Sequence, residues 1–326
     1  MQKKYNVAII GCGNIAALYD EPQQYDRVLT HAHAYSLEPR VNLCAMVDVQ
    51  RHMADDAAKK WGGKPYYDAK DMLENENIDI ISICVPDRYH ENILDLCLSY
   101  KPKAVLCEKP LTLDMTSAER IVDEYANAGI YLSVNFSRRF DTSIINLGKA
   151  IAQGTYGNVL NAVGIYTKGI LHNGSHLIDI FRFLFGDVIK TIPLSARNDW
   201  NDNDLTLDAY LEFYNGAKAH LVGADEGQYS IFDINILCEK GRFQLSQFGL
   251  RMTEFHVRTD PVYPGCKDLN DGKCNKTGLN TAMLYAISNI IDTIEGKQTL
   301  ICSGVDAVIT QKICLELLRK YHMSGA

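Results

Sequence analysis

The chain has 326 residues, of which 47% are hydrophobic and 22% charged, as in a globular protein large enough for two domains. Its net charge of −7 argues against nucleic acid or an anionic membrane surface as the main partner. No apolar run has the length needed to cross a membrane, and no two of the ten cysteines have Cys-x-x-Cys spacing. Because several cysteines lie inside apolar runs, we expect them to be reduced and buried in a cytoplasmic protein.

A glycine-rich turn follows the first predicted strand. Val7 to Ile10 form a short β-branched apolar run that predicts a buried strand, and a Gly-x-Gly-x-x-Ala pattern comes directly after it. In such a turn the first glycine permits a sharp bend and the second lets the backbone approach a pyrophosphate. We therefore predict a dinucleotide site here rather than a merely structural turn. The cofactor-binding residues expected in it are Gly11, Gly13, Asn14 and Ile15.

An inserted loop is expected after this turn, because Pro22 and its polar neighbours interrupt any long helix. A short helix from about Thr30 to Leu37 should follow. His31 and His33 lie two residues apart and therefore face different sides of a helix. We interpret them as loop or surface histidines and not as a metal-binding pair.

The second predicted strand, Val41 to Val49, carries Asp48 near its end. An acidic residue in this place hydrogen-bonds the adenosine ribose hydroxyls and repels a 2′-phosphate, so NAD is favoured over NADP. Arg51 lies close enough in sequence to leave NADP possible. The alternative role for Asp48 is the N-cap of a helix expected over Arg51 to Trp61.

The almost continuous apolar run from Ile78 to Val85 is typical of a strand buried on both faces of a parallel sheet. Val85, Pro86 and His90 follow at its carboxyl end, where doubly wound sheets bind ligands. We include all three among the cofactor-binding residues. A cap on the next helix is the alternative for His90.

A further buried strand, Ala104 to Cys107, leads directly into Glu108, Lys109 and Pro110. A lysine at the carboxyl end of a parallel strand can hydrogen-bond a substrate hydroxyl. Burial and the charge of an oxidised nicotinamide would both lower the pKa of Lys109 and suit it to proton transfer. Glu108 would then position Lys109 or contact the nicotinamide ribose. A surface lysine paired with Glu108 is the alternative.

The ordered set of these motifs resembles the glucose-fructose oxidoreductase, inositol dehydrogenase and rhizopine-catabolism (Gfo/Idh/MocA) family of NAD(P)-dependent oxidoreductases. The residues that carry the resemblance are Gly11-x-Gly13-x-x-Ala16, Asp48, Val85-Pro86 with His90, and Glu108-Lys109-Pro110. The resemblance implies that Lys109 is a catalytic residue at the nicotinamide. It also implies that the chain crosses between domains near Arg138 and Arg139. Arg139 is expected to bind substrate, with an interdomain salt bridge as the alternative.

In the second half, Ser175 to Phe185 has helical spacing, and His172, His176 and Asp179 fall at i, i+4 and i+7. They should lie on one side, where we expect all three to bind substrate. The resemblance implies that His176 joins Lys109 in catalysis, with a buried core histidine as the alternative. The family commonly has Asp where this chain has His172, so the inositol dehydrogenase arrangement is not copied. No third zinc ligand is evident, and we predict no metal site.

From Thr206 onward, alternating segments separated by glycine-containing turns predict an antiparallel meander. The strands are expected at 207–213, 217–222, 231–238, 242–245 and 252–257. Residues 261–278 are expected to form a polar loop over the substrate cleft, and the helix at 305–322 should pack back toward the first domain. The exposed face of such a sheet suits association, and the resemblance implies a homodimer or homotetramer formed through it.

We therefore expect an α/β fold with a Rossmann domain over residues 1–122 and an α+β domain with a large open antiparallel sheet over residues 123–326. The Rossmann domain would have a doubly wound parallel sheet, with the strand at 130–134 as its last. The predicted function is NAD-dependent hydride transfer to or from a secondary alcohol or ketone of a sugar, cyclitol or nucleotide sugar. Two alternatives are a redox-neutral glycosidase that uses bound NAD and a regulatory protein that binds NAD without chemistry.

Overall fold

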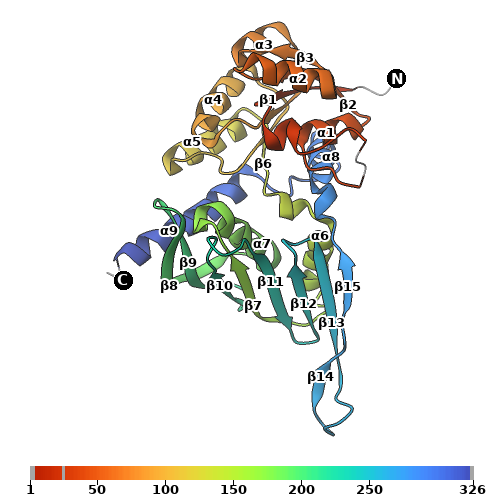
Figure 1. The fold of residues 1–326 in the computed structure, drawn as a ribbon, viewed down its shortest axis with the longest axis vertical. Coiled ribbons are helices and arrows are strands. Elements are labelled where there is room, and N and C mark those ends of the chain that lie inside the picture. The colour runs from red at the N-terminus through yellow and green to blue at the C-terminus, as the bar shows by residue number, and fades with distance from the viewer. Residues whose placement is uncertain (1–3, 24–25, 324–326) are drawn as a thin grey trace. The chain divides into compact units, whose positions relative to one another are not determined.

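The computed structural model describes residues 4–23 and 26–323 and divides the chain into two compact units. The first unit comprises residues 1–140 and 280–309, and the second comprises residues 141–279 and 310–326. Figure 1 shows their helices and strands, coloured along the chain.

The first unit contains a six-stranded parallel sheet in the order β3-β2-β1-β4-β5-β6, which is the doubly wound order of dinucleotide-binding domains. Its strands are β1 (Tyr5–Ile10), β2 (Val41–Val47), β3 (Lys64–Tyr66), β4 (Ile80–Ile83), β5 (Ala104–Cys107) and β6 (Tyr131–Val134). All four residues of β4 and of β5 are buried, as the apolar runs predicted. The first unit extends beyond the expected boundary at residue 122 because β6 pairs with β5.

Six α-helices of the described ranges lie wholly in the first unit (Figure 1). They are α1 (His31–Leu37), α2 (Arg51–Trp61), α3 (Ala69–Asn75), α4 (His90–Tyr100), α5 (Met115–Asn127) and α8 (Ala282–Ile294). A five-residue π-helical turn, Asn14–Leu18, follows the glycine motif. The late helix α8 completes the core, since its Ile287 and Ile291 pack with Val7 and Tyr35.

The second unit contains a nine-stranded sheet in which β14, β13, β12, β11, β7, β10, β9 and β8 are neighbours in that order and β15 pairs with β13. The strands are β7 (Val159–Tyr166), β8 (Val188–Asn201), β9 (Asp204–Phe213), β10 (Lys218–Gly223), β11 (Phe232–Cys238), β12 (Gly241–Ser246), β13 (Arg251–Thr259), β14 (Lys267–Leu269) and β15 (Lys273–Lys276). All neighbours are antiparallel except β7 and β10, which are parallel. The predicted sheet is confirmed, with this one parallel pair added.

Two predictions for the second unit were incomplete. The edge strand β8 was not predicted, because most of its residues are exposed and Pro193 and three register shifts interrupt its alternation. The expected polar loop at 261–278 contains β14 and β15, which both pair with β13. This segment therefore extends the sheet at the edge opposite β8.

Helix α7 (Ser175–Phe185) packs against the sheet at Gly164 of β7. A Cβ atom on Gly164 would lie only 2.8 Å from Leu177 and 3.2 Å from Phe181, so the helix needs a glycine there. The second unit also contains α6 (Thr142–Ala152). The last helix, α9 (Gly304–Met323), has its first six residues in the first unit and the rest in the second. Its expected packing toward the Rossmann domain stays a prediction.

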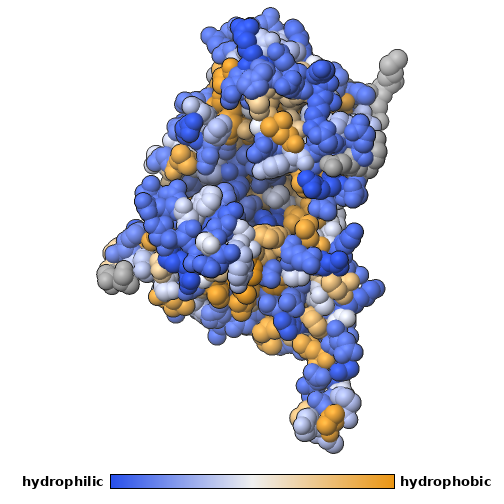
Figure 2. Space-filling model, in the orientation of Figure 1, coloured by the Kyte–Doolittle hydropathy of each residue, from blue (hydrophilic) through white to orange (hydrophobic). Residues whose placement is uncertain are grey.

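Figure 2 shows a mostly hydrophilic face with hydrophobic patches, several of them over the second sheet. Three of the exposed apolar residues on that sheet are Leu160, Val222 and Leu237. None of the helices in the described ranges is long and apolar enough to cross a membrane. Seven of the ten cysteines are buried and all are free thiols, which confirms them as mainly core residues.

Candidate cofactor and substrate sites

The predicted cofactor residues of the first unit lie at the carboxyl edge of its parallel sheet. The connections that leave this edge contain Gly11, Asp48, Val85, Glu108 and Asn135. Backbone hydrogen bonds continue the strand pairing into them, for example from the Glu108 amide to the Ile83 carbonyl. The edge is therefore held in register, and parallel sheets of this order bind ligands there.

The structure gives a different reason for a glycine at each of the two positions of the turn. Gly11 has φ +94°, and a Cβ atom on it would lie 2.6 Å from the carbonyl carbon of Cys84. Gly13 has an ordinary φ of −75° and no atom within 4 Å of its Cβ position. Gly11 is thus required by the fold, whereas the open space beside Gly13 fits the close approach of a pyrophosphate.

Asp48 ties the end of β2 to the glycine turn. Its Oδ2 accepts a hydrogen bond of 2.9 Å from the Cys12 amide, and its Oδ1 accepts one of 2.9 Å from the Gln50 amide. The N-cap of α2 is Gln50, so the alternative that Asp48 caps this helix is not what the structure contains. A carboxylate has further lone pairs, which leaves Asp48 able to accept from ribose hydroxyls.

His90 is buried and bridges two of the loops at this edge. Its Nδ1 lies 2.7 Å from the Pro110 carbonyl oxygen and its Nε2 lies 2.9 Å from the Val85 carbonyl oxygen. Both carbonyls can only accept, so a neutral ring donates to one of them and a doubly protonated ring donates to both. The ring nitrogens therefore join the loop after β4 to the loop that carries Lys109. A cofactor contact by His90 stays a prediction.

Glu108 is fixed by two side chains from other parts of the first unit. Its Oε1 accepts from Asn135 Nδ2 at 2.6 Å and lies 2.9 Å from His31 Nε2. Burial raises the pKa of Glu108, but the interactions with His31, the Asn135 amide and the Lys109 charge outweigh it and hold that pKa below its usual value. An ionised carboxylate thus stands directly beside Lys109.

The interpretation of His31 and His33 as loop or surface residues was wrong. Both are fully buried in α1. His31 contacts Glu108, and His33 Nδ1 lies 3.3 Å from Asp20 Oδ2. Spacing could show that they face different ways, but not that Ser82 and Glu108 contact one ring and Asp20 the other.

Arg139 is buried and forms an ion pair with Asp306 at 3.1 Å. Its guanidinium also donates to the Ile301 carbonyl at 3.1 Å. All three residues belong to the first unit. An ion pair was the alternative role for Arg139, although we had placed it between domains. Substrate binding by Arg139 stays a prediction.

In the second unit, His172 lies in the turn Gly169–Gly174 that leads into α7, and its exposed ring stacks on Trp200 with centroids 5.5 Å apart. Lys168 Nζ lies 5.3 Å from the centroid of the Trp200 ring. Asp204 holds the same turn, since its carboxylate accepts from the Leu171 amide at 2.7 Å and from the His172 amide at 2.9 Å.

His176 and Asp179 lie further along α7 and are both buried. His176 meets the edge of Phe232 with centroids 6.5 Å apart. Asp179 Oδ1 accepts a hydrogen bond of 3.3 Å from Thr310 of α9. The His172 ring is directed to Trp200 instead, so the three residues that share a predicted helical side have different neighbours.

Sequence reasoning missed several residues of these sites. His31 and Asn135 contact Glu108, and Ser82 contacts His31, whereas Asp204 and Trp200 contact the turn before α7. No local spacing relates them to the motifs, because His31 and Glu108 are 77 positions apart and Asp204 is 32 positions from His172.

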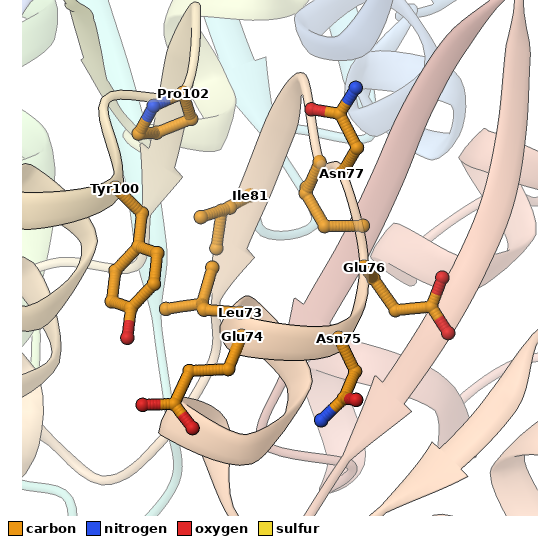
Figure 3. Close-up of a pocket in the computed structure, with 9 residues that line it drawn as sticks. Leu73, Glu74, Asn75, Glu76, Asn77, Ile81, Tyr100 and Pro102 are labelled. Carbon is orange, nitrogen blue, oxygen red and sulfur yellow. The ribbon is translucent and has the colours of Figure 1, made fainter.

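A polar pocket of the first unit lies away from these residues (Figure 3). It is lined by the end of α3 and the segment that follows, by Ile81 and by Tyr100 and Pro102. Apart from Ile81, which lies in β4, these residues precede β4 and β5, so the pocket is at the amino edge of the sheet. Within the described ranges, no cluster of His, Cys, Asp or Glu could hold a metal ion.

The sheet order and the glycine turn of the first unit are those of a dinucleotide-binding domain. Residues 5–136 match the family described as "Oxidoreductase family, NAD-binding Rossmann fold". The match is to the Gfo/Idh/MocA family over this part of the chain, which confirms the resemblance and the predicted NAD-binding class.

Named relatives and solved structures agree with this assignment. Myo-inositol 2-dehydrogenase of Thermotoga maritima is 29% identical over 152 residues, which cover 46% of this chain and 42% of that protein. The chain spans about half the length of the curated relatives it matches.

Two solved structures share the fold over nearly the whole chain. An NAD binding oxidoreductase from Klebsiella pneumoniae has a TM-score of 0.80 at 15% identity, with 98% of each chain covered. The WlbA dehydrogenase from Bordetella pertussis, in complex with NADH and UDP-GlcNAcA, has a TM-score of 0.77 at 17% identity, with 99% of this chain and 96% of that chain covered. At these identities the likeness shows the fold alone.

Proposed function

We propose that the chain is an NAD-dependent oxidoreductase that moves a hydride between the nicotinamide and a secondary alcohol or ketone of a sugar, cyclitol or nucleotide sugar. The observation that carries this proposal is the ionised Glu108 held beside Lys109, at the same sheet edge as Gly13 and Asp48. A lysine at this edge would suit proton transfer to or from a substrate hydroxyl.

The first unit supplies groups that suit each part of the cofactor. Gly11, Gly13, Asn14 and Ile15 would hold the pyrophosphate, and Asp48 would accept from the adenosine ribose hydroxyls. Val85 and Pro86 would lie against the nicotinamide half, with His90 holding their loop. When bound, NAD supplies the hydride acceptor for oxidation, and NADH supplies the donor for reduction. Asp48 favours NAD, and NADP is the less suited form.

Lys109 would move the proton that accompanies the hydride. In oxidation its neutral amine accepts the proton of the substrate hydroxyl, while the hydride leaves the carbon that bears this hydroxyl. In reduction its ammonium returns that proton to the forming alkoxide. His176 would hold the substrate hydroxyl or share this proton. His172 would bind substrate from the turn before α7, and Asp179 would orient this helix through Thr310.

The proposed substrate class rests on similarity to proteins named inositol dehydrogenases and to a solved structure that contains UDP-GlcNAcA. The exposed ring of Trp200 beside His172 supports a sugar, because aromatic faces pack well on apolar ring surfaces. A homodimer or homotetramer through the second sheet, supported by its exposed apolar residues, belongs to the same proposal. The cytoplasmic location stays a prediction.

The test is absorbance at the NADH band, with purified protein and NAD presented to inositols, free sugars and UDP- or GDP-sugars. NADH with the corresponding keto-sugars tests the reverse direction. We expect one substrate class to give a signal that Lys109→Ala abolishes. Lys59→Ala is the matched control, because Lys59 is an exposed lysine on α2. Turnover that survives in Lys109→Ala contradicts the proposed role, and product without net NADH indicates the redox-neutral glycosidase.

A further inference from the structure

A buried chain of hydrogen bonds runs through the first unit and ends on Glu108. Tyr35 Oη and Ser82 Oγ are 2.9 Å apart, and Ser82 Oγ is 2.9 Å from His31 Nδ1. On the other side of the ring, His31 Nε2 is 2.9 Å from Glu108 Oε1. Tyr35, Ser82 and His31 are at most 2% exposed.

The hydrogens of this chain have one consistent arrangement for a neutral imidazole. The carboxylate can only accept, so His31 must carry its hydrogen on Nε2. Nδ1 is then an acceptor for the Ser82 hydroxyl, and Ser82 in turn accepts from Tyr35. The two hydroxyl groups therefore select the imidazole tautomer that donates to Glu108.

The connectivity of Ser82, His31 and Glu108 resembles that of a hydrolase triad, but burial assigns it another role. Ser82 has no exposed surface, so no substrate reaches its oxygen. Glu108 is the one end of this hydrogen-bond chain that lies outside the core, because it is partly exposed, and it precedes Lys109.

We propose that His31 is a positioning residue for Lys109, because it keeps Glu108 ionised and oriented beside that lysine. The proposal rests on the proposed function of Lys109. Burial alone favours the neutral carboxylic acid, and hydrogen bonds to the charged form reverse this preference. Asn135 supplies one such bond and His31 supplies the other, so loss of His31 leaves burial less compensated.

The groups that face Glu108 come from several elements. They are His31, Asn135, Lys109 and the thiols Cys84 and Cys107. Burial, together with the charge of Glu108, holds the pKa of both thiols well above its usual value, so they stay neutral near pH 7. His31, Asn135 and Lys109 are therefore the donor or cationic groups whose removal changes the state of Glu108.

Loss of the negative charge on Glu108 should lower the pKa of Lys109. A negative charge beside an amine favours its protonated form, and its loss lowers the pKa of the amine. We expect Glu108→Gln to lower the pKa of Lys109 by about one pH unit or more. His31→Leu should shift it in the same direction. His31→Gln should leave it near the wild-type value, because a glutamine amide can still donate to Glu108.

The experiment is competitive labelling with trace acetic anhydride between pH 6 and 11, with acetylation of each lysine followed by peptide mass spectrometry. Lys59 on α2 serves as the internal reference. His33→Gln is the matched control, since His33 is also buried in α1 but contacts Asp20 and not Glu108. We expect the midpoint pH of Lys109 acetylation to be lower in Glu108→Gln and His31→Leu than in the wild type. It should be unchanged in His33→Gln. The double variant His31→Leu/Glu108→Gln should have the same Lys109 midpoint as Glu108→Gln alone.

A His31→Leu midpoint equal to or above that of the wild type overturns the proposal. If His31→Leu does not fold, His31→Asn replaces it, because asparagine is too short to reach Glu108. Labelling needs no substrate, so it is independent of turnover by Lys109→Ala. Loss of turnover without a midpoint shift in the His31 variants would overturn this inference alone. Retained turnover in Lys109→Ala would overturn the proposed function.

Discussion

The Asp48 carboxylate accepts a hydrogen bond from the amide of Cys12, so the end of β2 and the turn after β1 are joined directly. This contact places an acidic group beside the turn that we assign to the pyrophosphate. It also makes Asp48 both a support of the turn and a candidate ligand for the ribose.

We predict that Asp48→Ala weakens NAD binding by about tenfold or more, because a hydrogen bond to a charged group contributes about 1.5–3 kcal/mol. NADP binding should be unchanged or stronger, since the repulsion of the 2′-phosphate is removed. Isothermal titration calorimetry with both nucleotides measures the two affinities. Asp56→Ala, an exposed position on α2, is the control. Equal NAD affinity in wild type and Asp48→Ala would contradict the assigned role.

The two glycines of the turn should respond differently to the same substitution. Gly11→Ala places a methyl group against the Cys84 backbone at a positive φ, so we expect a clear loss of Tm together with loss of NAD binding. Gly13→Ala meets open space at an ordinary φ, so Tm should remain near the wild-type value while NAD binding is lost. Thermal unfolding and calorimetry separate the two effects. Normal NAD affinity in Gly13→Ala would argue against a pyrophosphate beside this residue.

The Arg139–Asp306 pair predicts a pH dependence of stability. Burial raises the pKa of Asp306, but Arg139 and the Ser303 hydrogen bonds outweigh it and hold that pKa below its usual value of 3.8. A lowered folded-state pKa gives stability that is present above the unfolded pKa and lost as the pH falls through the folded pKa. Stability should therefore decrease between pH 5 and pH 3.

Asp306→Asn should lower the free energy of unfolding at pH 7 by about 3 kcal/mol, since it removes the ion pair made by the buried Arg139. It should also reduce the difference between pH 7 and pH 3. Urea unfolding at the two pH values measures both quantities. Asp123→Asn, at an exposed position of α5, should change neither. An unchanged pH difference in Asp306→Asn would mean that other carboxylates cause the acid loss.

Asp204 should act on substrate binding through the turn before α7. Asp204→Ala removes the acceptor of the Leu171 and His172 amides, so His172 loses its defined position on Trp200. We expect a higher KM for the substrate found in the absorbance panel and an unchanged Kd for NAD. Asp202→Ala is the control, because Asp202 is exposed at the tip of the same hairpin. Equal effects of the two variants on KM would show that the contact to the turn is not responsible.

The strands β1, β2, β4 and β5 were predictable because each is a short, largely apolar run with a glycine, proline or charged residue within the next three positions. The second sheet was predictable where burial alternates, as in β7, β11 and β12. β8 was missed because most of its residues are exposed, and such a strand carries no alternating signal. β14 and β15 were missed because their mostly polar residues are read locally as a loop.

Local spacing was sufficient for the glycine turn, for Asp48 at the end of β2 and for Lys109 at the end of β5, because each depends on the backbone within a few residues. The folded chain was needed to bring His31 to Glu108 and Arg139 to Asp306. These partners are separated by 77 and 167 positions, where the sequence carries no periodic signal. It was also needed to show that His172 lies on Trp200, since helical spacing relates residues within one helix and not the strand that packs beside it.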